Sequence, residues 1–342
     1  MRVRKDKVLV AMSGGVDSSV AAGLLLRAGC DVTGVFLRLA RAADAADARA
    51  AADALGIDLH SLDLADAFEE IIAHFAAEYA AGRTPNPCIR CNRRIKFGRL
   101  MERADALGIE YVATGHHARL AEADGGRALF RGKARGKDQS YALFEVPRAR
   151  LGRILLPIGE VGGKDEVRRI ARDMHLPVHD KPDSQEICFV PDDDYAALLR
   201  RIRPDAMRPG EIVNAAGEVL GRHDGYGQFT VGQRRGLGVA AGVPMYVTRI
   251  DPAAARVTIG PRSEVMSRRL AAAGANWHAD VPEAFDALVQ VRYNHRGAPA
   301  RVRLSGTETF EVEFAEPVHA VTPGQAAVCY DGDRLLGGGW IE

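Results

Sequence analysis

Cys88 and Cys91 form a Cys-x-x-Cys pair in the segment TPNPCIRCN, where prolines precede them and a run of arginines follows. Such a pair can hold a metal ion, cycle between dithiol and disulfide, or supply one nucleophile. The other cysteines of the chain, Cys30, Cys188 and Cys329, are isolated from one another. A structural zinc site needs four ligands, usually as two close pairs, and the sequence offers no second pair.

A thioredoxin-like dithiol would begin a helix directly after a strand, whereas the prolines around Cys88 predict a loop. A third interpretation pairs Cys91 with Cys188, which lies 97 residues further on in DSQEICFVPDDDY. Most free cysteines are small core residues, but the polar residues before Cys188 are unusual for a core strand. Close to the arginine-rich segment, we expect such a thiol to have a lowered pKa and thiolate character.

The segment AMSGGVDSS, residues 11–19, is a second group of residues that could do chemistry. Its paired glycines allow a tight turn that exposes N–H groups beside a helix start, an arrangement that binds phosphate oxygens. The usual phosphate loop ends in a lysine, which is missing here. Asp17 instead predicts a carboxylate that helps to hold Mg²⁺, with Ser13 and Ser18 as hydrogen-bond donors. The alternative is an ordinary strand–turn–helix with a serine cap. Nucleotide activation together with two reactive cysteines suggests sulfur transfer.

The elements that must position these residues alternate between strands and helices in the first half of the chain. The patterns predict strands at 8–12, 31–37, 57–64 and 111–117, and helices at 18–28, 44–55 and 66–81. Such alternation predicts an α/β fold with a mostly parallel sheet covered on both faces, and ligands at the carboxyl ends of its strands.

The pattern changes after the proline-bearing segment 201–210, where short alternating strands are separated by glycines. Strands at turn-length spacing are typical of small β domains and barrels. We predict three domains: an α/β nucleotide-binding catalytic domain at 1–203, a small central β-rich domain at 204–269 and a C-terminal β-barrel-like domain at 270–342.

The composition describes a globular protein with an ample core, because 47% of the 342 residues are hydrophobic and 27% are charged. The apolar stretch 8–12 is too short for a signal peptide, and no run approaches membrane-spanning length. We therefore expect a cytoplasmic protein without a membrane partner. The net charge of +1 neither requires nor excludes a nucleic acid, but two segments, 90–103 and 127–137, are strongly basic.

The loop at 11–19 resembles the signature of the PP-loop, or N-type ATP pyrophosphatase, superfamily. Members of this superfamily cleave ATP to AMP and pyrophosphate and adenylate a carbonyl oxygen. Further motifs resemble, in the same order, those of the bacterial tRNA-specific 2-thiouridylases, and they cover residues 8 to about 240. These motifs are AMSGGVDSSVAAGLL, AGRTPNPCIRCNRRIKFGRL, ATGHHARL, KDQSYAL, LPIGEVGGKDEVRRIA, DSQEICFV and FTVGQRRGLG.

The resemblance implies a PP-loop ATP pyrophosphatase domain and a two-stage reaction on tRNA. ATP, with Mg²⁺, would adenylate the C2 carbonyl of the wobble uridine in the anticodon stem-loop, and sulfur would then displace AMP. Cys188 matches the residue that carries the sulfur as a persulfide, and Cys91 matches the nucleophile that ends in a transient disulfide with Cys188. A sulfur-donor relay protein or a cysteine desulfurase is implied as a partner.

The same resemblance implies two sets of binding residues. The ATP site would comprise Ala11, Met12, Ser13, Gly14, Gly15, Val16, Asp17, Ser18, Leu37 and Gly115. Contacts with tRNA would come from Asn86, Pro87 and Cys88 at the target base, and from Lys137, Asp138, Gln139, Arg292 and Tyr293 elsewhere. Some relatives carry an aspartate, proposed as an acid or base, where this chain has Cys88, so that role does not transfer. The segment after Leu37 is also shorter than in many relatives.

Two other functions remain open on the residues alone. Another PP-loop enzyme, such as an amide-forming synthetase, would need neither Cys91 nor Cys188. A non-enzymatic RNA-binding protein would use the basic segments and β domains, bind tRNA without consuming ATP, and leave the SGGVDS loop without a purpose.

Overall fold

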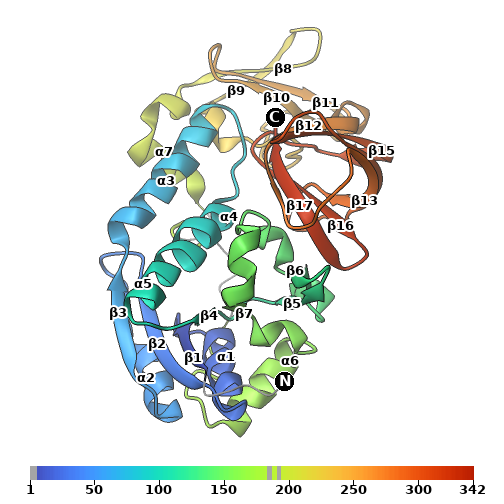
Figure 1. The fold of residues 1–342 in the computed structure, drawn as a ribbon. Helices are drawn as coiled ribbons and strands as arrows, with labels where there is room; N and C mark the ends of the chain where they lie inside the picture. Colours follow the sequence, from blue (N-terminus) through green and yellow to red (C-terminus); the bar gives the residue numbers. More distant parts are fainter. Residues whose placement is uncertain (1–5, 183–186, 191–193) are drawn as a thin grey trace.

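The computed structural model describes residues 6–182, 187–190 and 194–342. A parallel sheet with the strand order β3-β2-β1-β4-β7 forms the N-terminal part of the molecule (Figure 1). Its strands are β1 (Lys7–Ala11), β2 (Asp31–Arg38), β3 (Leu59–Asp63), β4 (Tyr111–Ala113) and β7 (Ile154–Leu155). The helices of this part are α1 (Val16–Arg27), α2 (Ala46–Leu55), α3 (Ala65–Ala80), α4 (Pro87–Cys91), α5 (Leu100–Ala106) and α6 (Lys164–Asp173).

The sheet is apolar on both faces because successive side chains of a strand point to opposite sides. In β1, Val8 and Val10 pack into the core that contains α1, α2 and α6. Leu9, between them, packs into the opposite core with residues of α5. All three are fully buried. Helices therefore cover both faces, as the alternating pattern predicts.

The Cys-x-x-Cys segment is where the secondary-structure prediction is wrong. It forms the short helix α4 rather than a loop, and the chain continues as a π-helix, η1 (Asn92–Arg99), into α5. Asn86 caps α4, since its side-chain oxygen accepts a hydrogen bond from the N–H of Cys88 at 3.2 Å. Pro87 stands at the first helical position, where its fixed φ suits a helix and its missing N–H costs nothing.

A second sheet with the order β10-β11-β8-β9 follows the helix α7 (Tyr195–Ile202). Its strands are β8 (Gly210–Val213), β9 (Val219–His223), β10 (Tyr246–Asp251) and β11 (Arg256–Gly260). Val247 and Val257 share a core with Ala80 at the end of α3. The Tyr226 hydroxyl also donates to the carbonyl of Ala80 at 3.0 Å, which joins this β domain to the α/β domain.

The C-terminal strands form an antiparallel barrel, in the order β12-β15-β14-β13-β16-β17, that closes through pairing of β12 with β17. They are β12 (Met266–Trp277), β13 (Ala284–Gln290), β14 (Ala298–Leu304), β15 (Thr309–His319), β16 (Ala326–Asp331) and β17 (Arg334–Ile341). The predicted fold class, an α/β domain followed by a β-rich domain and a barrel, is confirmed. No helix among the described residues is long and apolar enough to cross a bilayer.

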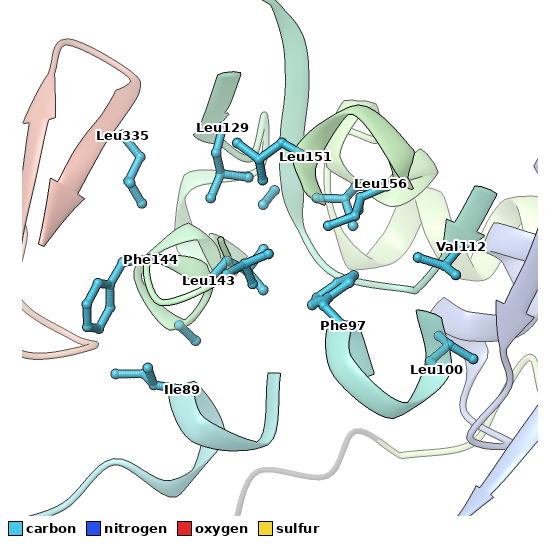
Figure 2. Close-up of a cluster of buried hydrophobic side chains, with 14 of the residues drawn as sticks. Ile89, Phe97, Leu100, Val112, Leu129, Leu143, Phe144, Leu151, Leu156 and Leu335 are labelled. Atoms are coloured by element: carbon cyan, nitrogen blue, oxygen red, sulfur yellow. The ribbon is translucent and has the colours of Figure 1, made fainter. Parts of the chain in front are cut away.

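The barrel is joined to the α/β domain by strand pairing and by a shared core. The hairpin β5 (Ala118–Ala123) and β6 (Gly126–Arg131) extends the barrel sheet, because Phe130 pairs with Arg334 of β17. Figure 2 shows Leu335 of the barrel beside Phe144 and Leu129 of the α/β domain, and all three belong to one buried cluster. Ile89 of α4 lies in the same cluster, so the barrel helps to fix the Cys-x-x-Cys helix.

Candidate functional site

The glycine-rich loop joins the end of β1 to the start of α1 and is held by its own serines. The Ser18 hydroxyl donates to the Gly15 carbonyl at 3.0 Å and accepts from the N–H of Ser13 at 3.2 Å. The Ser19 hydroxyl makes a similar bond to Gly15 at 3.0 Å. With the loop fixed in this way, the N–H groups and the positive end of α1 form a ready site for an anion.

Two glycines have conformations or contacts that a larger residue would disturb. Gly14 has a φ of +75°, in the left-handed region that glycine adopts without strain. Gly115, after β4, lies against the backbone of the loop, and a Cβ there would stand 2.7 Å from the carbonyl carbon of Asp17 and the nitrogen of Ser18. The segment that follows β4 therefore packs directly against the backbone of the phosphate-binding loop.

The carboxylate of Asp17 is engaged by two side chains from distant segments. Lys164 Nζ, at the start of α6, lies 3.0 and 2.9 Å from the two carboxylate oxygens, and His117 Nε2 lies 3.4 Å from Oδ1. Burial alone would raise the pKa of Asp17, but the hydrogen bonds and charges of His117 and Lys164 outweigh it and hold the pKa below its usual value. Lys181 Nζ also donates to the Gly14 carbonyl at 3.1 Å.

A cavity of about 580 Å³ opens above this loop at the carboxyl end of the sheet. Its volume is in the usual range for a small-molecule site. Of the predicted ATP-site residues, it is lined by Ala11, Met12, Ser13, Asp17, Ser18, Leu37 and Gly115. The same cavity is lined by Cys188, Lys96, His116 and Gln139, so it brings the predicted sulfur carrier together with the phosphate-binding loop.

Cys91 is buried at the end of α4 and packs with Phe68 and Ile71 of α3. Burial raises the pKa of its thiol, the positive charge of Lys96 offsets part of the rise, and Cys88 adds to it. Cys188 is exposed, in the described stretch 187–190. Its neighbour Phe189 contacts the rings of Phe68 at 5.6 Å and Phe75 at 5.2 Å, which fixes this stretch on α3.

The expectation of a lowered thiol pKa is wrong for Cys188, and the pKa of Cys91 is raised as well. Desolvation by the surrounding protein, together with the nearby Cys91 and Cys88, raises the pKa of Cys188 to about 11. Lys96 is the neighbour that lowers the pKa of both thiols. The arginines of the Cys-x-x-Cys segment do not act as expected because they face elsewhere: Arg90 stacks on Trp340 at 5.0 Å, and Arg93 pairs with Glu145 at 3.0 Å.

A buried polar cluster connects the helix after Cys91 with the segment after β4. Asn92 donates to the Ala142 carbonyl at 2.9 Å, and its side-chain oxygen lies 3.1 Å from His116 Nε2. His116 Nδ1 lies 2.7 Å from the Thr114 hydroxyl, and Lys96 Nζ lies 3.5 Å from His116 Nε2. Burial, with the charges of Lys96 and His117, lowers the pKa of His116 well below its usual value. His116 is therefore neutral at physiological pH.

The residues predicted to line the target base lie at the start of α4. Cys88 is exposed, while Asn86 and Pro87 line a second, smaller cavity between α3 and the barrel. Tyr293, 42% exposed, lies near Cys88, which contributes to raising the Tyr293 pKa after burial and Asp138. The structure thus brings Tyr293 of the barrel to the same place as Cys88, 205 residues away in sequence.

The other predicted tRNA residues lie in two places. Lys137 and Asp138 follow the hairpin β5–β6; the Asp138 carboxylate is turned inward, where it accepts hydrogen bonds from Gly132 N–H at 2.9 Å and the Ser140 hydroxyl at 2.9 Å. Gln139 accepts from the His117 N–H at 2.9 Å and lines the large cavity. Arg292 donates to the Val231 carbonyl at 2.6 Å, which links the barrel to the central domain.

These contacts bear on which groups the cavity can hold. A nucleotide fits this cavity. The N–H groups of the loop can bind phosphates, and the cavity volume and the bare Cα of Gly115 leave room for them. Asp17 already accepts hydrogen bonds from Lys164 at both carboxylate oxygens, so Mg²⁺ bound directly by Asp17 would share this carboxylate with the ammonium. Among the described residues, no group of three or more His, Cys, Asp or Glu side chains could hold a metal ion.

Sequence reasoning did not single out Lys164, Lys181, His117 or Lys96. Lys164 lies within the quoted motif LPIGEVGGKDEVRRIA, but its separation of 147 residues from Asp17 hides the contact. A lysine at the start of a helix next to two glycines was the available signal.

The glycine-rich loop at the end of β1, the cavity above it and the two β domains define a class of nucleotide-binding α/β proteins with appended β domains. Family models agree: "tRNA methyl transferase HUP domain" matches residues 6–192, "tRNA methyl transferase PRC-barrel domain" matches 197–261, and "Aminomethyltransferase beta-barrel domain" matches 267–341.

Full-length relatives define the family within that class. The chain is 47% identical to the tRNA-specific 2-thiouridylase MnmA of Carboxydothermus hydrogenoformans, over 99% of this chain and 98% of the relative. It is 46% identical to the protein of that name from Syntrophotalea carbinolica over the full length of both chains, and 47% identical to the one from Acidithiobacillus ferrooxidans over 98% of each. The chain therefore belongs to the tRNA-specific 2-thiouridylase family.

Proposed function

We propose that this protein is an ATP-dependent tRNA 2-thiouridylase, which replaces the C2 oxygen of the wobble uridine with sulfur. The observation that carries the proposal is the single cavity lined by both the phosphate-binding loop and Cys188. Activation of a carbonyl and delivery of sulfur must occur at the same carbon atom, so the two groups have to meet in one site. Membership of the family, whose relatives bear this name, supports the same function.

The first stage is adenylation of the uracil by ATP, with release of pyrophosphate. The C2 oxygen of the base attacks the α-phosphorus, and the bond to the β-phosphate oxygen breaks. The loop N–H groups at the start of α1 bind the phosphates, and Lys164 and Lys181 add positive charge beside the same loop. Asp17 orients Lys164 through its two hydrogen bonds. Mg²⁺ would enter this stage as the counter-ion of ATP.

The second stage is the transfer of sulfur. The terminal sulfur of a persulfide on Cys188 attacks C2, and AMP leaves with the former carbonyl oxygen. The Cys91 thiolate then attacks Sγ of Cys188, the bond between that Sγ and the transferred sulfur breaks, and its electron pair forms the thiocarbonyl. The resulting Cys91–Cys188 disulfide is returned to two thiols by a dithiol reductant.

The exposure of Cys188 supports delivery of the persulfide by an external donor, either a relay protein or a cysteine desulfurase. The anticodon stem-loop would approach from the side where Cys88 and Tyr293 lie, with the target base turned out of its stack. Tyr293 offers an exposed ring on which an unpaired base can stack. Lys137 would contact the tRNA backbone. Asp138 and Arg292 would stabilise the protein segments that form the tRNA-binding surface. We place the reaction in the cytoplasm, where tRNA and ATP are available.

Nucleoside analysis tests the proposal directly. Undermodified tRNA is incubated with the protein, ATP, Mg²⁺, a cysteine desulfurase with cysteine as the persulfide source, and a dithiol reductant, then digested and separated by liquid chromatography with mass spectrometry. The expected result is 2-thiouridine at the wobble position, together with AMP and pyrophosphate in equal amounts. ATP-dependent release of AMP without any thiolated nucleoside would instead favour a PP-loop enzyme that acts on another carbonyl.

A further inference from the structure

The half-buried Lys96 lines the cavity that also contains the phosphate-binding loop and Cys188. Asp17 and Ser18 of the loop line the same cavity. The ammonium of Lys96 lies 3.5 Å from His116 Nε2, and the side-chain oxygen of the buried Asn92 lies 3.1 Å from the same nitrogen. Because Asn92 Oδ1 can only accept, His116 Nε2 donates to it, and the neutral imidazole lies beside Lys96 without neutralising its charge.

The π-helical geometry of η1 explains why Lys96 faces the cysteines. Cys91 is the N-cap residue of η1, and Lys96 follows five residues later. In an α-helix, residues five apart point about 140° away from each other. In a π-helix, hydrogen bonds join residues five apart, so such residues lie on nearly the same face. The change from α4 to η1 therefore turns Lys96 toward the side of Cys91.

We propose that Lys96 is a positioning residue for sulfur transfer, whose ammonium stabilises the anionic sulfur on Cys91 and the anionic persulfide on Cys188. The proposal rests on the proposed function, since it concerns the same site. Both sulfur groups must react as anions, and burial of Cys91 opposes this. A fixed positive charge in the cavity is the physical means of offsetting that cost. The protons released by the sulfur groups pass to solvent.

The charges around the two thiols single out Lys96 for this role. The charges of Lys96 and Cys88 shift the pKa of the Cys91 thiol. The pKa of Cys188 is shifted by Lys96, Cys91 and Cys88. The other ionisable groups lining the cavity are Asp17, Arg41, Glu69 and His116. Asp17 is paired with Lys164, and Arg41 with Asp66 at 3.0 Å. Among the described cavity residues, Lys96 is thus the cation that acts on both sulfur atoms.

The test measures the reactivity of each thiol with iodoacetamide between pH 7 and 11, on the full chain without ATP or tRNA. Trypsin cleaves after Arg90, so peptide mass spectrometry reports Cys88 and Cys91 separately. Lys96→Met should move the profiles of Cys91 and Cys188 to higher pH and slow their alkylation at pH 8 about three- to tenfold, since one pKa unit corresponds to a factor of about ten. Lys96→Arg should stay close to the parent protein.

Arg94→Met is the matched control, because it removes a neighbouring cation of η1 that faces Glu70 at 3.5 Å rather than the cavity. It should leave both profiles unchanged. The fully buried Cys329 reports on folding, since a loosened structure would make it react faster. If Lys96→Met loosens the fold in this way, Lys96→Gln, which keeps polarity and similar length, takes its place.

Coincident profiles of Cys91 and Cys188 in a folded Lys96 variant and the parent protein would overturn the proposal. So would a variant whose loss is confined to ATP affinity, because Lys96 would then be a phosphate ligand. The result for Lys96 can be distinguished from the result for the proposed function, because the thiol profiles and the formation of 2-thiouridine are measured separately. Shifted profiles in a protein that makes no 2-thiouridine would sink the function and leave the effect of Lys96 on the thiols standing. Formation of 2-thiouridine with unshifted profiles would sink only the role of Lys96.

Discussion

The phosphate-binding loop and Cys188 line the same cavity, yet the structure holds them in different ways. The loop is fixed by short bonds within its own segment, such as those from Ser18 and Ser19 to Gly15, and by the close approach of Gly115. Cys188 is exposed, and its stretch is fixed through the neighbouring ring of Phe189 against α3. The difference fits the two proposed tasks, because phosphates need a preorganised cradle whereas a sulfur carrier must be reached from outside.

Cys91 and Cys188 also differ from each other. Cys91 is buried in an apolar cluster with Phe68, while Cys188 lines the cavity and remains exposed, although the surrounding protein partly desolvates it. A buried thiol is protected from external donors and oxidants, and an exposed one is available to them. This contrast favours Cys188 as the residue that receives sulfur and Cys91 as the nucleophile that acts later, inside the site.

The largest effect should come from the sulfur site. Cys91→Ser and Cys188→Ser should each abolish formation of 2-thiouridine, because a hydroxyl of normal pKa can neither carry a persulfide nor form the disulfide. Nucleoside analysis of tRNA measures the loss. Both variants should still bind ATP, which fluorescence or calorimetric titration measures, since the loop does not depend on either thiol.

The remaining cysteines are the controls for this prediction. Cys30→Ser and Cys329→Ser should stay active, although Cys329 is fully buried and its serine variant should lose about 1–3 kcal/mol of stability from an unpaired hydroxyl. Cys88→Ser should keep substantial activity if Cys88 only lines the base pocket. An inactive Cys88→Ser enzyme beside an active Cys91→Ser enzyme would reverse the assignment within the Cys-x-x-Cys pair.

Asp17→Asn should give the next largest effect, on the nucleotide side. The substitution removes the charge that holds Lys164 at 2.9 Å, so pyrophosphate release should fall about 100-fold through misplacement of the ammonium. A coupled pyrophosphate assay measures the rate, and an unchanged thermal unfolding midpoint shows that the fold is intact. If the parent protein released ADP rather than AMP, the nucleotide chemistry would be misassigned.

Gly115→Ala should weaken ATP binding about five- to tenfold, because its Cβ would stand 2.7 Å from the backbone of Asp17 and Ser18 and displace the loop. Equilibrium titration with ATP checks this. Gly152→Ala is the matched control, since nothing lies within 4 Å of its Cβ and its φ is not positive. Equal affinities of the two variants would mean that the segment around Gly115 does not shape the phosphate site.

The smallest effect is expected at Lys137, outside the cavity. Lys137→Ala should weaken tRNA binding and reduce the salt dependence of the affinity by about one unit of slope, as expected for one lost phosphate contact. Filter binding at several salt concentrations measures both quantities. A weaker affinity with the original slope would mean that Lys137 acts on the structure around Asp138 rather than on the tRNA backbone.

Much of the fold and site could be predicted because the signals are local. The short apolar run 8–12 specified β1, the alternation of strands with helices specified the layers around it, and the paired glycines specified the turn into α1. The prolines of the Cys-x-x-Cys segment predict a loop, but this prediction is wrong. Pro87 in fact stands at the first position of α4, which Asn86 caps, and at that position proline favours a helix.

The sequence by itself determined the backbone of the phosphate loop, the order of the motifs and which cysteines stand within them. It could not determine the charges in the site. The lysine that the loop lacks is supplied by Lys164 and Lys181, 147 and 167 residues from their partners in the loop. Burial likewise raises the pKa of each reactive thiol, and Lys96 lowers it in part. Motifs encode local backbone geometry, whereas electrostatics depends on which distant segments pack together, and only the tertiary structure decided that.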